Sequence, residues 1–211
     1  MRSILALSVF AIVTVAAHAR TPLLPVDEAS KDPSFAAFRT ELQEIVENKD
    51  HKALLERVSE NIEFSFGEDA GKENFIRAWE LSDEKAAGSM LWAELDKVLS
   101  LGGAFMANGH FEAPYVSSSW PAELDAFDHV AVIGSRVRVR AQPNANSEIL
   151  YVASYEILKA EYANDPWIKV VTPDGQTGYM WSKYLRWPLD YRAHFTKVDG
   201  RWLMNVFIAG D

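Results

Sequence analysis

The chain has 211 residues, 30 of them acidic and 21 Lys or Arg, giving a net charge of −9, and it contains no cysteine. The lack of cysteine excludes disulfides, thiol catalysis and every zinc site that needs a thiolate. Nucleic acid is bound largely by neutralising its phosphates, so this acidic balance argues against a nucleic-acid partner. Residues 20–128 carry ten Lys and Arg against 22 acids, whereas residues 129–211 carry ten against eight, which predicts a domain boundary near residue 129.

Residues 1–19 have the pattern of a cleaved secretory signal peptide. Arg2 precedes a mostly apolar stretch from Ile4 to Ala17, and Ala17-His18-Ala19 is the small-x-small sequence that a signal peptidase accepts. Fourteen apolar residues are short for a hydrocarbon core of roughly 30 Å, which favours a signal over a retained anchor. No later segment reaches membrane-spanning length, so we expect a periplasmic or secreted protein with no transmembrane segment after cleavage.

The acidic part is expected to be a linker over residues 20–31 and a mainly helical domain over residues 32–128. Asp32-Pro33 supplies an N-cap and a proline at the first position of a helix that ends near Asn48. Asp50 can cap a second helix, and the sequence IEFSFG after it predicts a strand over residues 62–67. The apolar stripes of the four expected helices are Phe35, Phe38, Leu42, Ile45 and Val46; Leu54, Leu55, Val58 and Ile62; Phe75, Ile76 and Trp79; and Leu91, Leu95, Val98 and Leu99.

No motif in the acidic part predicts catalysis. His110-Phe111-Glu112 matches the H-x-E of zinc deaminases, but their partner motif needs cysteines. The histidines at 51, 110, 129 and 194 show no close metal-ligand spacing, so exposed or singly bonded histidines are the simpler interpretation, although a four-histidine site stays conceivable. We therefore predict no catalytic residue, no metal site and no cofactor.

From residue 129 the hydrophobic period changes from 3.6 to 2. Val137 and Val139 alternate with Arg136, Arg138 and Arg140, so the valines can face a core while the arginines face water or form a ligand-binding stripe. Further short strands are expected over residues 149–152, 156–161, 167–171 and 178–181, the last two joined at Pro173-Asp174-Gly175. Short strands with regular turns indicate a small barrel.

Residues 129–187 resemble a bacterial Src-homology-3-like domain. The similarity is carried by VRVRAQP at 137–143, by WIKV, by the hairpin DGQTGYMW and by the closing SKYL. Two positions depart from the family pattern: the glycine usual before the middle strand is missing at Ala153–Glu156, and Tyr179 stands where tryptophan is commoner. The resemblance implies recognition of a cell-wall peptide or an envelope protein by aromatic side chains on the rim. The candidate binding residues are Tyr155, Tyr162, Trp181 and Tyr184, whereas Trp167 is expected in the core.

Residues 188–211 predict a terminal hairpin that turns at Val198-Asp199-Gly200-Arg201. In its second strand Trp202, Met204, Val206 and Ile208 fill one face, while Leu203 and Phe207 fill much of the other. A strand that is apolar on both faces needs cover on both sides, so we expect the hairpin to pack back on the helical part. Helices, one strand and a terminal hairpin also bear a loose resemblance to the nuclear-transport-factor-2-like cone, whose curved sheet forms a pocket.

The fold class expected is α+β: a mainly helical domain, a small all-β barrel and a hairpin that joins them. The favoured function is a non-catalytic binding protein whose barrel recognises cell-wall peptide or an envelope protein. Two alternatives stay open. One is a cell-wall hydrolase with carboxylates in the acidic half, and the other is a small-molecule carrier with a pocket among the helices.

Overall fold

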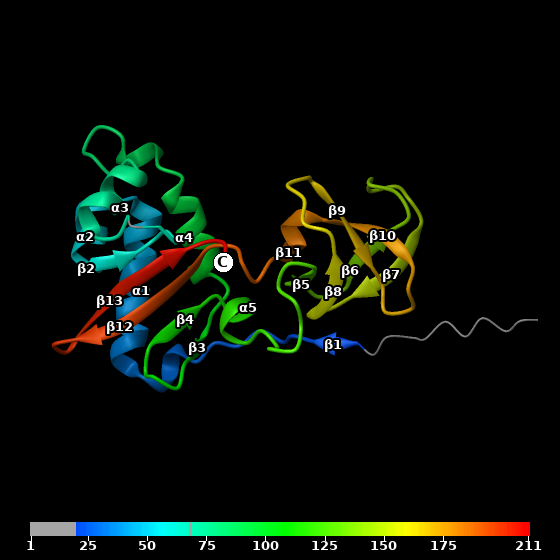
Figure 1. Ribbon diagram of the computed structural model, residues 1–211, viewed down its shortest axis with the longest axis horizontal. Coiled ribbons are helices and arrows are strands. Elements are labelled where there is room, and N and C mark those ends of the chain that lie inside the picture. Colours follow the sequence, from blue (N-terminus) through cyan, green and yellow to red (C-terminus); the bar gives the residue numbers. More distant parts are fainter. Residues whose placement is uncertain (1–19, 68) are drawn as a thin grey trace, which may run out of the picture.

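The computed structural model describes residues 20–67 and 69–211, and the predicted signal peptide lies outside this range. Figure 1 shows two lobes side by side, which we call the α+β lobe and the β lobe. Within the described residues, no helix is both long and apolar enough to cross a bilayer.

The bounds of the elements follow the chain. The α+β lobe contains α1 (Pro33–Asn48), α2 (His51–Glu56), β2 (Val58–Glu63), α3 (Lys72–Ala78), α4 (Leu91–Leu99), β3 (Ala104–Phe105), β4 (Phe111–Ala113), α5 (Tyr115–Ser118), β12 (Arg192–Val198) and β13 (Arg201–Ile208). The β lobe contains β1 (Thr21–Pro22), β5 (His129–Val132), β6 (Val137–Arg140), β7 (Ile149–Ala153), β8 (Glu156–Ala160), β9 (Trp167–Val171), β10 (Thr177–Trp181) and β11 (Leu185–Arg186). Short 3-10 turns lie at Ala29–Lys31, Ala86–Gly88 and Ser182–Tyr184.

The first helix is the one that the sequence predicts. The Asp32 carboxylate accepts hydrogen bonds from the backbone N–H groups of Ser34 and Phe35 at 2.7 and 3.3 Å, so it caps α1 as expected. Its apolar stripe is buried and, together with α4, packs on the sheet of the α+β lobe. The helix ends at Asn48, and the backbone of its C-cap residue Lys49 is left-handed.

The second helix is shorter than its apolar stripe predicts. Helix α2 ends at Glu56, and Val58 and Ile62 belong to strand β2 instead. The reason is tertiary: β2 pairs in parallel with β13, where Val58 lies opposite Met204, and the Met204 N–H donates to the carbonyl of Arg57. Long-range pairing therefore overrides a helical spacing that β-branched residues only weakly support.

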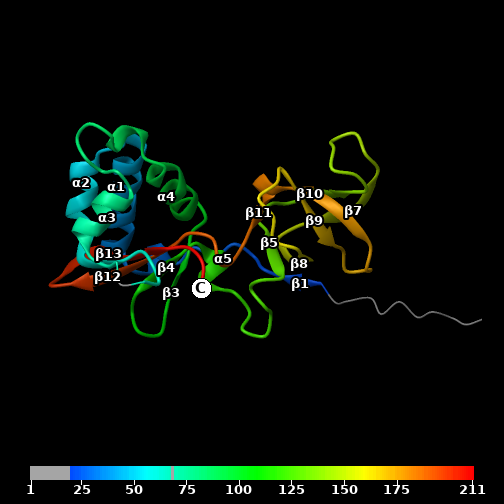
Figure 2. The same cartoon turned by 45° about the horizontal axis from the view of Figure 1, so that its top comes forward.

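The expectation of a mainly helical first domain is incomplete, because the helices rest on a mixed five-stranded sheet. Its strand order is β2-β13-β12-β4-β3. Figure 2 shows helices α1 to α4 on one face of this sheet. Phe111 of β4, Phe195 of β12 and Met204 of β13 point toward them and are fully buried.

The terminal hairpin packs on the helical part, as the doubly apolar strand predicts. Strand β13 pairs with β2 on one side and with β12 on the other, and β12 continues the sheet to β4. The turn between them has left-handed backbone at Asp199 and Gly200, with φ values of 49° and 79°. The hairpin therefore supplies two of the three inner strands of the sheet.

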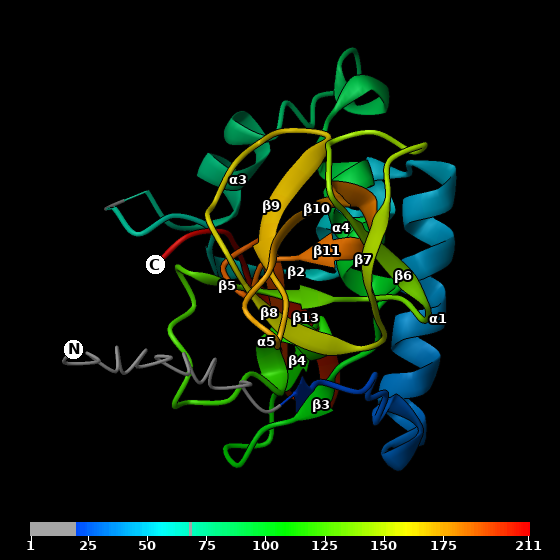
Figure 3. The same cartoon turned by 90° about the vertical axis from the view of Figure 1, so that its right-hand side faces the viewer.

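In the chain, the β lobe is inserted between β4 and β12, which are neighbouring strands in the sheet of the α+β lobe. After β4 and α5 the chain enters β5, completes the β lobe at β11 and only then returns to form β12 beside β4 (Figure 1). Viewed from its end in Figure 3, the β lobe is an antiparallel sheet that bends around one core, with Val139, Val170 and Met180 fully buried in it.

Residues 20–31, for which the sequence predicts a linker, contact both lobes. Strand β1 pairs with β8 of the β lobe, and Leu23 is buried against residues of both lobes. Farther along, Asp27 accepts two hydrogen bonds from the Arg39 guanidinium of α1. The arm therefore ties the β lobe to the first helix.

Candidate functional site

A groove of about 290 Å³ runs over the outer surface of the β lobe. Its walls include Arg136, Arg138, Arg140, Trp167, Trp181 and Tyr184. Trp181 is 43% exposed and Tyr184 is 40% exposed, which is unusual for such large aromatic side chains. The groove therefore offers aromatic surface and positive charge together.

The alternation of β6 places the arginines at this groove. Val137 and Val139 are buried in the core, so Arg138 and its neighbours on the same face point outward. This confirms the orientation that the sequence predicts for the strand. The Arg140 guanidinium donates to the carbonyl of Ser147 at 2.6 Å, whereas Arg138 is exposed.

The aromatic wall of the groove follows from strand register. Trp181 of β10 lies directly opposite Trp167 of β9, and their ring centroids are 5.3 Å apart. The prediction that Trp167 belongs to the core is wrong, because this side chain is half-buried in the groove wall. Ile168 and Val170 of β9 fill the core, and Trp167 faces outward because successive side chains of a strand point to opposite faces.

The charge at the groove has one sign. None of the eight residues that line it is acidic. The Lys183 ammonium lies 5.8 Å from the centre of the Trp181 ring and 4.8 Å from that of Tyr184, which adds a fourth cation at its rim. An anionic group is therefore favoured in this groove over a cationic one.

The structure brings together two of the four aromatic residues that the sequence proposes. Trp181 and Tyr184 line the groove, whereas Tyr162 packs on Trp187 with ring centroids 5.2 Å apart and borders a cavity of about 500 Å³ between α4 and the β lobe. Tyr155 is half-buried and adopts a φ of 47°, and it lies in the segment Ala153–Glu156. The four residues therefore do not form a single site.

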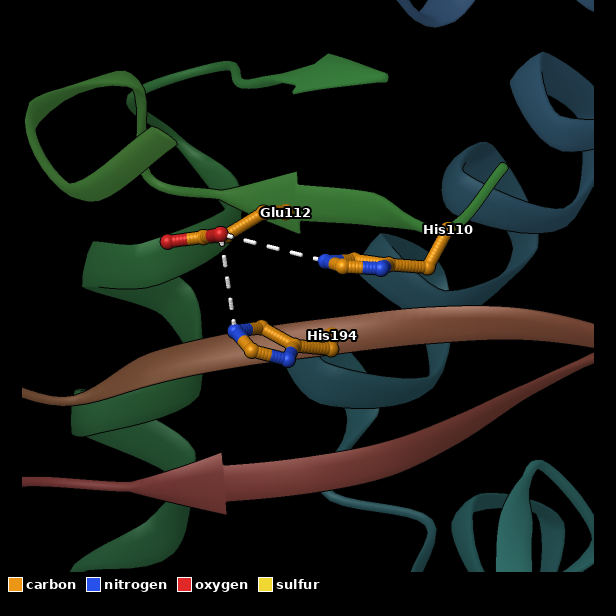
Figure 4. A group of neighbouring side chains, drawn as sticks. All are labelled: His110, Glu112 and His194. Carbon is orange, nitrogen blue, oxygen red and sulfur yellow. Dashed lines mark ion pairs between the residues drawn. The ribbon is translucent and has the colours of Figure 1, made fainter. Parts of the chain in front are cut away.

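A second polar cluster lies on the α+β lobe, where sequence spacing predicts none. Figure 4 shows the imidazoles of His110 and His194 directed at the carboxylate of Glu112. The Nε2 atoms of His110 and His194 are 3.9 and 3.6 Å from Glu112 Oε2, and the two rings stack with centroids 4.7 Å apart. The nearest sequence signal is H-x-E itself, since alternate residues of a strand share a face.

Strand register explains why these three residues meet. His194 of β12 lies directly opposite Glu112 of β4, and both point away from α1 and α4 because Phe111 and Phe195 point toward those helices. Burial lowers the pKa of His194 below its ordinary value of 6.5. The Glu112 carboxylate acts to raise this pKa, whereas the positive charges of His110 and Arg192 act to lower it further. The His194 ring is therefore neutral at pH 7.

Comparison with known families identifies the β lobe. Residues 135–186, about a quarter of the chain, match the family model of the bacterial SH3 domain. No curated protein and no solved structure matches the chain. Residues 135–186 are thus a bacterial SH3 domain, a kind of module that typically binds the cell wall.

Proposed function

We propose that this protein is a non-catalytic binding protein of the bacterial envelope whose SH3 domain holds a carboxylate-bearing cell-wall peptide in the groove of the β lobe. One observation carries the proposal. Trp167, Trp181 and Tyr184 line the same groove as three arginines, and none of the described residues that line it is acidic. The family of the domain supports a cell-wall ligand, and the predicted signal peptide supports delivery to the envelope.

The aromatic residues supply the apolar part of recognition. Trp181 is held by the sheet through β10, and Tyr184 lies in the 3-10 turn that follows it, so a peptide backbone that packs on these exposed rings costs the protein little conformational entropy. Aromatic and arginine side chains are also the residues that most often dominate binding energy. We therefore assign the central contact to Trp181.

The arginines supply the selection for charge. Arg138 is exposed between the two buried valines of β6, so its planar guanidinium is free to pair with a carboxylate through two parallel hydrogen bonds. Lys183 adds positive charge at the rim. Binding should accordingly weaken as salt concentration rises, because surface charges are screened.

The test is co-sedimentation of the full chain with purified cell wall. Trp181→Ala should weaken association about 10- to 100-fold, the effect of losing a central aromatic contact worth about 1–3 kcal/mol. Arg138→Gln should weaken it less and should reduce its dependence on salt. Tyr162→Ala is the matched control, since Tyr162 is 67% exposed but lies outside the groove.

The outcomes separate the groove from the rest of the surface. Equal binding by wild type and Trp181→Ala, with circular dichroism showing both folded, would contradict the groove as the site. Loss of binding in Tyr162→Ala alone would move the site to the cavity between α4 and the β lobe.

A further inference from the structure

The cluster of His110, Glu112 and His194 has a geometry that ordinary hydrogen bonding does not explain. The two Nε2–Oε2 separations of 3.9 and 3.6 Å are too long for hydrogen bonds. Yet the side chains are only 17%, 12% and 25% exposed, and among the described residues His110 Nε2 is a buried atom without a hydrogen-bond partner. Buried polar atoms normally have partners, so this arrangement needs an explanation.

An ion placed among the three atoms provides one. Zinc lies about 2.0–2.2 Å from histidine nitrogen and carboxylate oxygen, so neighbouring ligand atoms of a tetrahedral site are about 3.3–3.5 Å apart. The ligand atoms here all lie within 4.8 Å of one another, and the two Nε2–Oε2 separations exceed that spacing by only a few tenths of an ångström. We propose that His110, Glu112 and His194 form a binding site for a divalent transition-metal ion, with zinc the best fit. This site is separate from the groove of the SH3 domain.

The donor set selects the class of metal. Calcium and magnesium prefer oxygen ligands alone, whereas two imidazoles with one carboxylate suit zinc and its first-row neighbours. Three protein ligands leave a fourth position for water or another small ligand, the arrangement of open rather than closed zinc sites. His194 is one quarter exposed, so the site can exchange its ion with solvent.

The surroundings hold the carboxylate in place. The Ser117 hydroxyl of α5 donates a hydrogen bond to Glu112 Oε1, which leaves Oε2 for the ion. Such support of a ligating carboxylate is typical of metal sites. Arg192 also lies on this face, but its guanidinium donates to the carbonyl of Gly210.

Metal binding requires one rearrangement. The imidazole planes are now inclined by only 23°, and an ion must lie close to the plane of each ring that ligates it. Both rings cannot meet this condition while they stay stacked. The rings must turn apart about their Cβ–Cγ bonds before both can ligate the same ion.

The test is calorimetric titration of the untagged full chain with Zn²⁺, and with Mg²⁺ as the comparison ion. We expect one zinc per chain and no measurable magnesium binding. His110→Gln and His194→Gln should each weaken zinc binding tenfold or more, an effect at least as large as that of losing a supporting residue around a metal. His129→Gln is the matched control, because His129 pairs with the single carboxylate of Asp128.

A second measurement does not depend on how the variants fold. In the wild-type protein, zinc should shift the ring-nitrogen NMR signals of His110 and His194 and leave those of His51 and His129 unchanged. Failure of the wild type to bind zinc, or shifts only at other histidines, would overturn the proposal. Neither result would bear on the groove, since cell-wall binding is measured independently.

Discussion

Gly178 is the residue on which the close approach of two strands in the SH3 domain depends. A Cβ at this position would lie 2.6 Å from Val139 Cγ1 and 2.9 Å from the carbonyl oxygen of Arg140. One of these neighbours is backbone of the paired strand β6, so the contact cannot be relieved by a side-chain rotation alone. Packing therefore requires glycine at the last position of the D-G-x-x-G hairpin, which is Gly178.

Replacing Gly178 by alanine should lower the free energy of unfolding of the β lobe by about 1–3 kcal/mol, because the added methyl group overpacks the core. Urea unfolding followed by tryptophan fluorescence measures the change, since Trp167 and Trp181 lie in this lobe. Gly88→Ala is the control: its Cβ would meet nothing within 4 Å, and its stability should stay within about 0.5 kcal/mol of wild type. Equal stability of the two variants would refute the packing argument.

At the scale of the elements, the terminal hairpin is part of the α+β core. Strands β12 and β13 lie between β2 and β4, so they pair on both sides. Five side chains of this hairpin belong to the buried core of the α+β lobe: Ala193, Phe195, Trp202, Met204 and Phe207. Without the hairpin, β2 would lose its partner strand β13, β4 would pair only with β3, and α1 would lose the buried side chains that β12 and β13 contribute to the shared core.

A chain that ends at Trp187 should therefore lose helical circular dichroism or aggregate. Each large apolar side chain contributes about 1.5–3 kcal/mol when buried, and the lost sum is comparable with the 5–15 kcal/mol that stabilises a typical domain. Deleting only Asp211, an exposed residue beyond β13, is the control and should change nothing. Unchanged helical melting in the truncated chain would show that the hairpin is dispensable.

At the scale of the whole molecule, the SH3 domain interrupts the sheet of the α+β lobe without contributing to its core. No residue from 114 to 192 is among the fully packed members of that core, although the half-buried Tyr191 touches it. Ala113 at the end of β4 lies directly opposite Ala193 near the start of β12, so a tight turn could join the two strands. We infer that the α+β lobe is a folding unit made of two separate chain segments.

This inference predicts that the β lobe can be excised. Replacing residues 115–191, which span the short helix α5 as well as strands β5 to β11, by four Gly and Ser residues makes a hairpin loop of ordinary length between β4 and β12. The product should keep helical circular dichroism and unfold cooperatively, with some loss of stability because Leu23 loses the buried surroundings that it shares with Ile157. An unfolded product would contradict the two-segment unit and show that the α+β lobe needs the SH3 domain in order to fold.

Features that depend on residues close together in the chain could be predicted from the amino-acid sequence. The cap of α1 by Asp32, the inward valines of β6 and the left-handed turn at Asp199-Gly200 are all present as predicted. Each follows from local backbone preference and hydrophobic period, which do not depend on distant partners. The order of motifs from Val137 to Leu185 likewise sufficed to identify the SH3 domain.

The pairing of distant segments could not be predicted from local sequence and is visible only in the folded chain. The position of Val58 in a strand, the sheet beneath the helices and the meeting of Glu112 with His194 all depend on the pairing of β2 and β4 with β13 and β12, which lie far from them in the chain. The outward face of Trp167 was likewise decided by the register of β9 against β10. Strand register shifts a side chain from one face to the other with a single-residue slip, and no local spacing in the sequence specifies that register.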